Sequence, residues 1–346
     1  MDNKKKRLSI LFFLIVLLLT LYTFFHGQNL TDIYDAIRKM RIYDFLGAVA
    51  CGLLFVCMEG MMIWYLLHCM GEQSSLHRCI QYSFIGFFYS GITPSASGGQ
   101  PMQLYYMTKD GRKTSNSTVA LMTVAVIYKF ILVVIGLFLI IFCRKTLLEY
   151  LGTYYALCIV GLMLNVILVV LILAVMFYPV VIHKVGEFVI QILKRFGIGK
   201  NTDTMNVSWN HFMSGYQEAV QFLKQKTKVI FVLCVITLLQ RSSAFFVTYL
   251  IYQGFYQTGR GMGLIMALQA SVYIAVDMLP VPGAQGITEM MYSHVFASIF
   301  PAQLLIPSMV VCRGVVFYLP LFVSFSIILI KKIVQLSSEH KMSETV

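Results

Sequence analysis

Two Pro/Gly-rich interruptions within strongly apolar sequence constrain this chain most. The first is GITPSASGGQP at Gly91–Pro101, and the second is LPVPGAQG at Leu279–Gly286. Such breaks free backbone N–H and C=O groups, for which hydrocarbon offers no hydrogen-bond partner. Each break must therefore lie inside protein or line a wet cavity. Paired breaks in corresponding places of two halves indicate the midplane binding site of a membrane transporter.

The composition is that of an integral membrane protein. Hydrophobic residues make up 58% of the 346 residues and charged residues only 12%, whereas soluble domains carry roughly 25% charged residues. The net charge of +12 comes from basic residues that cluster between apolar stretches, which predicts membrane orientation rather than nucleic-acid binding. The eight cysteines form no CxxC pair, so we expect buried thiols, with no metal site and no cofactor.

The apolar stretches predict an all-α polytopic membrane protein. A helical span needs roughly 20 mainly apolar residues. Two interrupted stretches, about 80–108 and 263–300, are too short on either side of the break to cross, and each is predicted to be a re-entrant helical hairpin. The alternative is a pair of Pro-kinked helices without symmetry. Six stretches qualify as full transmembrane helices: about 8–26, 45–67, 117–142, 153–178, 229–252 and 303–330.

The basic residues predict the orientation in a cell membrane. With both termini cytoplasmic and both hairpins re-entrant, eighteen basic residues lie inside and six outside, in accordance with the positive-inside rule. The first hairpin then enters from the cytoplasm and the second from outside. Residues 1–346 thus form one domain, in which repeat A (about 45–142) and repeat B (about 229–330) have inverted topology.

A long connection, about 180–228, separates the two predicted repeats. Hydrophobic residues from Val181 to Phe196 recur at helical spacing opposite basic ones. This pattern predicts a basic amphipathic helix on the inner leaflet. A small cytoplasmic helical hairpin packed on the protein is the alternative.

Six ionisable residues fall inside predicted membrane segments, where each costs roughly 2.5–3.5 kcal/mol at a helix centre. We expect these acids and bases to pair in the interior of the bundle, with Glu59 and Lys129 as candidates for either a structural or a functional charge pair. The two arginines lie on the spans that flank the second hairpin, and a guanidinium suits a phosphate. The six are Glu59, Lys129, Arg241, Asp277, Glu289 and Arg313.

The breaks themselves predict an anion site, because a helix restarts after each of them and presents free N–H groups near the bilayer centre. Glu289 lies in the first turn of the second such helix, where it either caps that turn or contacts substrate. The predicted substrate-binding residues are Thr93, Ser95, Ser97, Gly98, Gly99, Gln100, Arg241, Asp277, Pro282, Gly283, Gly286, Glu289 and Arg313.

Three strings carry a family resemblance: TPSASGGQPMQLYY (Thr93–Tyr106), LPVPGAQGITE (Leu279–Glu289) and RGVVFYLP (Arg313–Pro320). They resemble the transmembrane region of lysylphosphatidylglycerol synthases, which includes the flippase part of the multiple peptide resistance factor. The second string departs from the family's more usual PGGxGxxE form, with Ala284 and Gln285 at the middle positions. The resemblance covers essentially the whole chain.

The resemblance implies a flippase-like transporter that moves an anionic or aminoacylated phospholipid between leaflets. Its partners would be a membrane phospholipid and a separate lipid synthase, and an oligomer is compatible with it. Full-length relatives carry a soluble transferase domain, which we do not expect in this chain. No catalytic constellation or nucleotide-binding loop emerges from the residues. The alternatives are a phosphatidylglycerol lysyltransferase, by family name, or a membrane subunit of a separate synthase.

Overall fold

The computed structural model describes residues 30–93, 96–178, 202–279 and 281–344, and within these ranges the fold is entirely helical. Five helices are long and apolar enough to cross a membrane, which confirms five predicted spans within a few residues. The predicted span 8–26 lies outside the described residues. The five are α3 (Ile42–Cys69), α6 (Thr114–Phe142), α8 (Tyr154–Phe177), α11 (Thr227–Gly254) and the kinked pair Ala302–Ile333.

The kinked pair consists of α14 (Ala302–Arg313) and the first part of α15 (Leu319–Glu344). A π-helical segment, Gly314–Tyr318, joins the two helices. The irregular segment lies directly before Leu319 and Pro320. Single π-helical turns of this kind often mark functional sites.

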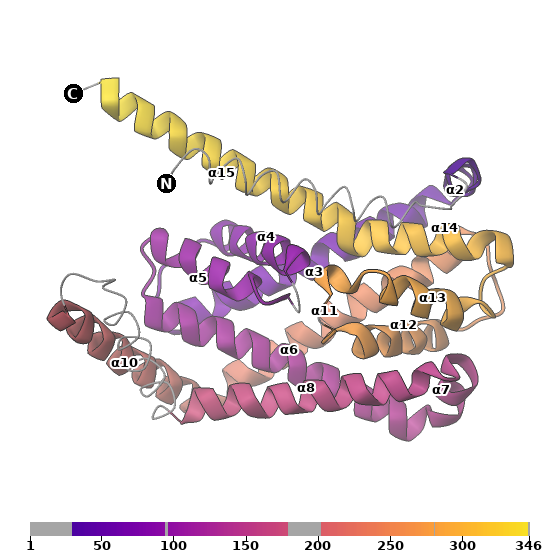
Figure 1. The fold of residues 1–346 in the computed structure, drawn as a ribbon, viewed down its shortest axis with the longest axis horizontal. Helices are drawn as coiled ribbons and strands as arrows, with labels where there is room; N and C mark the ends of the chain where they lie inside the picture. The colour runs from indigo at the N-terminus through magenta and orange to yellow at the C-terminus, as the bar shows by residue number, and fades with distance from the viewer. Residues whose placement is uncertain (1–29, 94–95, 179–201, 280, 345–346) are drawn as a thin grey trace.

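Each interrupted stretch folds into two short helices that pack on each other. The first consists of α4 (Leu76–Ile92) and α5 (Gly99–Lys109), and the second of α12 (Met262–Val276) and α13 (Ile287–Phe296). In Figure 1, α4 and α5 occupy one half of the length of α6 and α8, and α12 and α13 occupy the other half. The two hairpins therefore approach the middle of the bundle from opposite ends, as re-entrant hairpins require.

The neighbours of the two hairpins correspond. The first packs through α4 on α3 and through α5 on α6, whereas the second packs through α12 on α11 and through α13 on α14. The helices α3 and α11 also pack extensively against each other at the centre. This correspondence agrees with the inverted repeat, which itself stays a prediction.

Three further helices lie at the ends of the bundle. The helix α2 (Leu30–Arg38) packs on α14, and α7 (Arg144–Leu151) connects α6 to α8. The helix α10 (Thr202–Gln225) packs on α6. The predicted amphipathic residues from Val181 to Phe196 lie outside the described residues, and a membrane-surface position for this connection stays a prediction.

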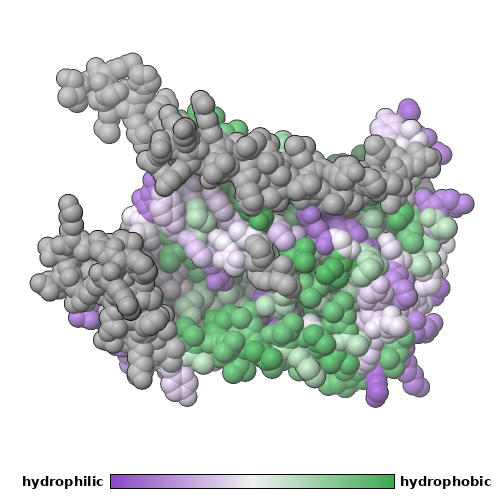
Figure 2. Space-filling model, in the orientation of Figure 1, coloured by the Kyte–Doolittle hydropathy of each residue, from purple (hydrophilic) through white to green (hydrophobic). Residues whose placement is uncertain are grey.

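Buried apolar side chains form two large clusters, one around each hairpin. One joins α3, α4, α6, α10 and α11, and the other joins α8, α11, α12, α13 and α14. On the face shown in Figure 2, hydrophobic residues gather over α8 and the middle of the bundle, and hydrophilic residues gather at the end that holds α7. This distribution suits a bundle whose middle faces lipid.

Small residues allow the helices to approach closely, as is common in membrane bundles. The clearest case is Gly60 of α3, where an added Cβ would lie 2.6 Å from the Cα of Ile80 in α4. Backbone atoms cannot move aside as a flexible side chain can. Gly60 therefore fixes how closely the first hairpin packs on its spanning helix.

We expect Gly60→Ala to lower the free energy of unfolding by about 1–3 kcal/mol, because overpacking displaces α4. Thermal unfolding of the purified chain in detergent measures the effect. The matched control is Gly263→Ala in α12, where no atom lies within 4 Å of the added Cβ. Equal unfolding temperatures for Gly60→Ala and the unchanged protein would contradict the close packing of α3 on α4.

Candidate functional site

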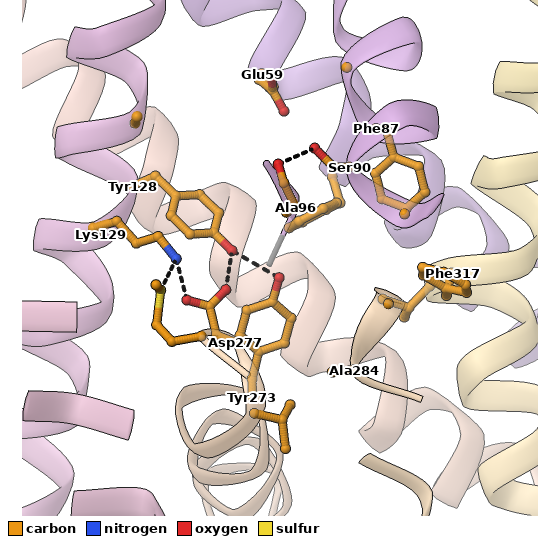
Figure 3. A pocket seen from close by; sticks show the side chains of 18 of the residues that line it. Glu59, Phe87, Ser90, Ala96, Tyr128, Lys129, Tyr273, Asp277, Ala284 and Phe317 are labelled. Carbon is orange, nitrogen blue, oxygen red and sulfur yellow. Dashed lines mark hydrogen bonds and ion pairs between the residues drawn. The ribbon is translucent and has the colours of Figure 1, made fainter. Parts of the chain in front are cut away.

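A cavity of about 560 Å³ lies between the tips of the two hairpins. This volume is in the usual range for sites that bind small molecules. Its wall includes Ala96 and Ser97 from the first tip, and Gly283 and Ala284 from the second. Figure 3 shows Ala96 and Ala284 on the same cavity. Spanning helices α3, α6, α8, α11 and α14 complete the wall.

The Thr93 side chain bonds two backbone groups at the first tip. The Thr93 hydroxyl accepts a hydrogen bond from the Gly98 N–H at 2.9 Å and donates to the Tyr89 carbonyl at 2.6 Å. Ala96 has a positive φ of 55°, which is strained for a residue with a Cβ. The Gly98 N–H was predicted to be available to an anion, and the structure shows that it is already bonded. Ser95 lies outside the described residues.

The second tip contains a matching strained alanine. Ala284 has φ 50°, next to Gly283 with φ 58°, and Gly286 has φ 78° directly before α13. The Ala284 carbonyl accepts from the Thr288 hydroxyl at 2.7 Å. The Gly283 carbonyl accepts from Arg313 Nη2 at 3.0 Å. Strain of this kind persists only where the surroundings enforce it and is concentrated at functional sites.

Arg313 attaches the second tip to the kinked helix pair. Its Nε lies 2.8 Å from Glu289 Oε1, and the side chains of both residues are about 15% exposed or less. This pair meets the expectation from the sequence that acids and bases pair with each other inside the bundle. Glu289 Oε1 accepts from Arg313 Nε, and its Oε2 is buried without a partner. The pairing with Arg313 replaces the capping role considered from the sequence.

A second ion pair lies across the cavity, between Lys129 of α6 and Asp277 at the end of α12. The Tyr128 hydroxyl donates to Asp277 Oδ1 at 3.1 Å and lies 2.9 Å from the Tyr273 hydroxyl. Figure 3 shows these four side chains converging on one corner of the cavity. The side chains of Lys129 and Asp277 are 14% and 9% exposed, so the pair lies in a poorly solvated place.

Arg241 of α11 has no carboxylate partner within 4 Å in the described part of the chain, although it is only 1% exposed. Its Nη1 donates to the Tyr273 hydroxyl at 3.2 Å and its Nη2 to Gln240 Oε1 at 3.3 Å. The guanidinium carbon lies 3.6 Å from the centre of the Tyr128 ring, and Nε has no hydrogen-bond partner. A buried, positively charged group is thus stacked on an aromatic ring, and its Nε has no hydrogen-bond partner among the described residues.

Glu59 of α3 is held by the first hairpin. Gln103 of α5, which is 2% exposed, donates from its amide to Glu59 Oε1 at 2.6 Å. An added Cβ at Gly86 would collide with the Gln103 side chain, so the glycine makes room for this contact. Of the two charge-pair candidates from the sequence, Lys129 pairs with Asp277. Glu59 has an amide partner, Gln103, and forms no ion pair with Lys129.

The cavity brings together eight of the fifteen residues that the sequence singled out: Glu59, Ser97, Gln100, Lys129, Arg241, Asp277, Gly283 and Arg313. Thr93, Gly98, Gly99, Pro282, Gly286 and Glu289 support the tips but do not line the cavity. Sequence reasoning missed Gln103, Tyr128, Gln240 and Tyr273, which hold the charged groups. These four residues could have been found as uncharged polar side chains within apolar stretches of the sequence.

The described residues contain no group of three or more His, Cys, Asp or Glu side chains that could hold a metal ion. The sequence matches the family described as the lysylphosphatidylglycerol synthase TM region over residues 8–324. The chain belongs to this family. No curated protein matches the chain. The family and the apolar helices together show a multi-pass membrane protein of the lysylphosphatidylglycerol synthase group.

We expect Glu289→Gln to destabilise this family member by about 3–5 kcal/mol, because the Arg313 charge stays buried without its partner. The double variant Glu289→Met with Arg313→Met removes both charges and should lose much less stability. Thermal unfolding in detergent compares the two. The control is Asp44→Asn, which breaks the Arg41–Asp44 pair, whose arginine side chain is 44% exposed, and should cost less stability than Glu289→Gln. A double variant less stable than the single one would contradict this interpretation.

Proposed function

We propose that this chain moves an anionic or aminoacylated phospholipid between the leaflets, with the headgroup passing through the cavity between the hairpin tips. The observation that carries this proposal is the buried Arg241 without a carboxylate partner. A buried charge without a directly bonded counter-ion is costly, and Glu59 acts on Arg241 only through space, beyond ion-pair distance. A lipid phosphate in the cavity would supply that counter-ion.

The surroundings of Arg241 favour a phosphate over a small diffusing anion. Tyr128 and Tyr273 fix the plane of the guanidinium, so its forked donors are pre-organised. A guanidinium recognises phosphate through parallel charge-assisted hydrogen bonds. Apolar side chains such as Leu168 and Ile172 of α8 line another part of the same cavity and suit contact with the lipid.

The position of Phe317 supports passage from one side to the other. Phe317 belongs to the π-helical segment and lines the cavity. Its ring lies 6.2 Å from that of Phe87 in the first hairpin, and an added Cβ at Gly283 in the second would press on it. The same side chain thus touches both hairpins. A small rotation of the kinked pair would change how the cavity opens to each end.

The direct test is lipid movement by the purified chain in liposomes that contain fluorescent phosphatidylglycerol or its lysyl ester. We expect Arg241→Lys to fold normally but to move the anionic lipid at least about tenfold more slowly. That ratio corresponds to roughly 1.4 kcal/mol, and a lysine cannot reproduce the forked donors. The readout is the fraction of fluorophore that dithionite added outside can quench over time.

The matched control is Arg260→Lys, an exposed arginine that donates to the Tyr150 hydroxyl at the end of the bundle. It should transport like the unchanged chain. Full transport by Arg241→Lys, with a normal unfolding temperature, would remove the headgroup role of Arg241. New lysylphosphatidylglycerol in cells that express only this chain would favour the lysyltransferase alternative instead.

A further inference from the structure

We infer that Asp277 is a proton-binding site, which takes up one proton when an anionic headgroup enters the cavity and releases it when the headgroup leaves. This inference rests on the proposed function and adds the ion that accompanies the lipid. It starts from the ion pair between Asp277, at the end of the hairpin helix α12, and Lys129, on the spanning helix α6. Both side chains line the cavity.

Lys129 can serve either Asp277 or an incoming anion. Its ammonium ends a flexible four-carbon stem, and its contacts are Asp277 Oδ2 and Met278 Sδ, the latter at 3.2 Å. Arg241 and Lys129 both lie against the Tyr128 ring, with the guanidinium carbon 3.6 Å and the ammonium nitrogen 5.1 Å from its centre. A phosphate held by Arg241 can therefore also reach Lys129 and compete with Asp277 for it.

Asp277 without Lys129 would be a carboxylate that is 9% exposed and has lost its counter-charge. Such a group is neutralised by protonation, because the neutral acid avoids most of the cost of burial. The Tyr128 hydroxyl already donates to Asp277 Oδ1 at 3.1 Å. The other oxygen, which Lys129 vacates, is free to carry the proton.

No other charge next to Asp277 replaces Lys129 among the described residues. On α11, Arg241 is separated from Asp277 by the linked Tyr128 and Tyr273 hydroxyls. On α3, Glu59 is bonded to Gln103 and would repel a second carboxylate. The side chains of α8 that line the cavity are apolar.

The deprotonated Asp277 carboxylate binds one proton from water to form a carboxylic acid as the phosphodiester takes over Lys129. When the headgroup leaves the cavity toward the opposite leaflet, Lys129 returns to Asp277 and the carboxylic acid releases its proton on that side of the membrane. One negative headgroup and one proton move together, so transport of phosphatidylglycerol is electroneutral. A pH gradient should drive it, and a membrane potential should not.

The first measurement uses the full chain in weakly buffered detergent with short-chain, water-soluble dihexanoyl phosphatidylglycerol and a pH indicator. We expect about one proton to be taken up for each ligand bound, and affinity to fall up to about tenfold for each unit rise in pH. Asp277→Asn should abolish the uptake per ligand bound. The matched control is the exposed acid Glu149, whose change to Gln should leave uptake intact.

Glu59→Gln and the double variant Glu289→Met with Arg313→Met, which leaves no unpaired charge at the second tip, keep the measurement decisive if Asp277→Asn does not fold. Uptake retained in both variants, per ligand bound, assigns the proton to Asp277, the remaining acid of the described cavity and its supports. Loss of uptake in either variant overturns the inference. Ligand binding by the unchanged chain without proton uptake also overturns it.

The second measurement separates this inference from the proposed function. Liposomes clamped at zero potential with valinomycin and potassium receive a pH gradient, and the leaflet distribution of fluorescent phosphatidylglycerol is followed. Accumulation toward the alkaline side supports proton coupling. Equal movement with and without the gradient overturns the coupling but leaves the lipid transport in place. No movement in either condition contradicts the proposed function itself.

Discussion

Lipid hydrocarbon offers no hydrogen-bond partner to backbone N–H and C=O groups. The two interrupted hairpins of this chain must therefore satisfy these groups within the protein. The Gly98 N–H is bonded by the Thr93 hydroxyl, and the Gly283 carbonyl by Arg313. The helices α4, α5, α12 and α13 carry the breaks to the middle of the bundle, where spanning helices enclose them. Because the tips are enclosed rather than exposed to lipid, a cavity can lie between them.

The charges of the cavity follow from the same constraint. Two cations that line the cavity have acidic partners: Lys129 pairs with Asp277, and Arg313 pairs with Glu289. Each pair ties a hairpin element to a spanning helix, so each stabilises the position of the second hairpin. Arg241 differs because its contacts are aromatic rings, a hydroxyl and an amide. On that difference rests our proposal that Arg241 binds a ligand, whereas the two ion pairs hold the second hairpin in place.

Much of this arrangement could be predicted from the sequence, because span length and Pro/Gly breaks are local signals. They gave the spanning helices and the two hairpins within a few residues, and the cost of a buried charge predicted a partner for Arg313. The partners of the other charges could not be predicted, because Lys129 and Asp277 are 148 positions apart and meet only through tertiary packing. The bond from Gly98 to Thr93 likewise depends on the conformation of the tip, which composition does not specify.

The most direct test of the central claim is lipid mass spectrometry on the gently purified chain, compared with Arg241→Met. We expect the unchanged chain to retain an anionic or aminoacylated phospholipid well above its share of the membrane. Arg241→Met, at a similar unfolding temperature, should lose that enrichment, because the cavity no longer presents an unpaired guanidinium. The same lipids in membrane proportion in both proteins would contradict a headgroup site at Arg241.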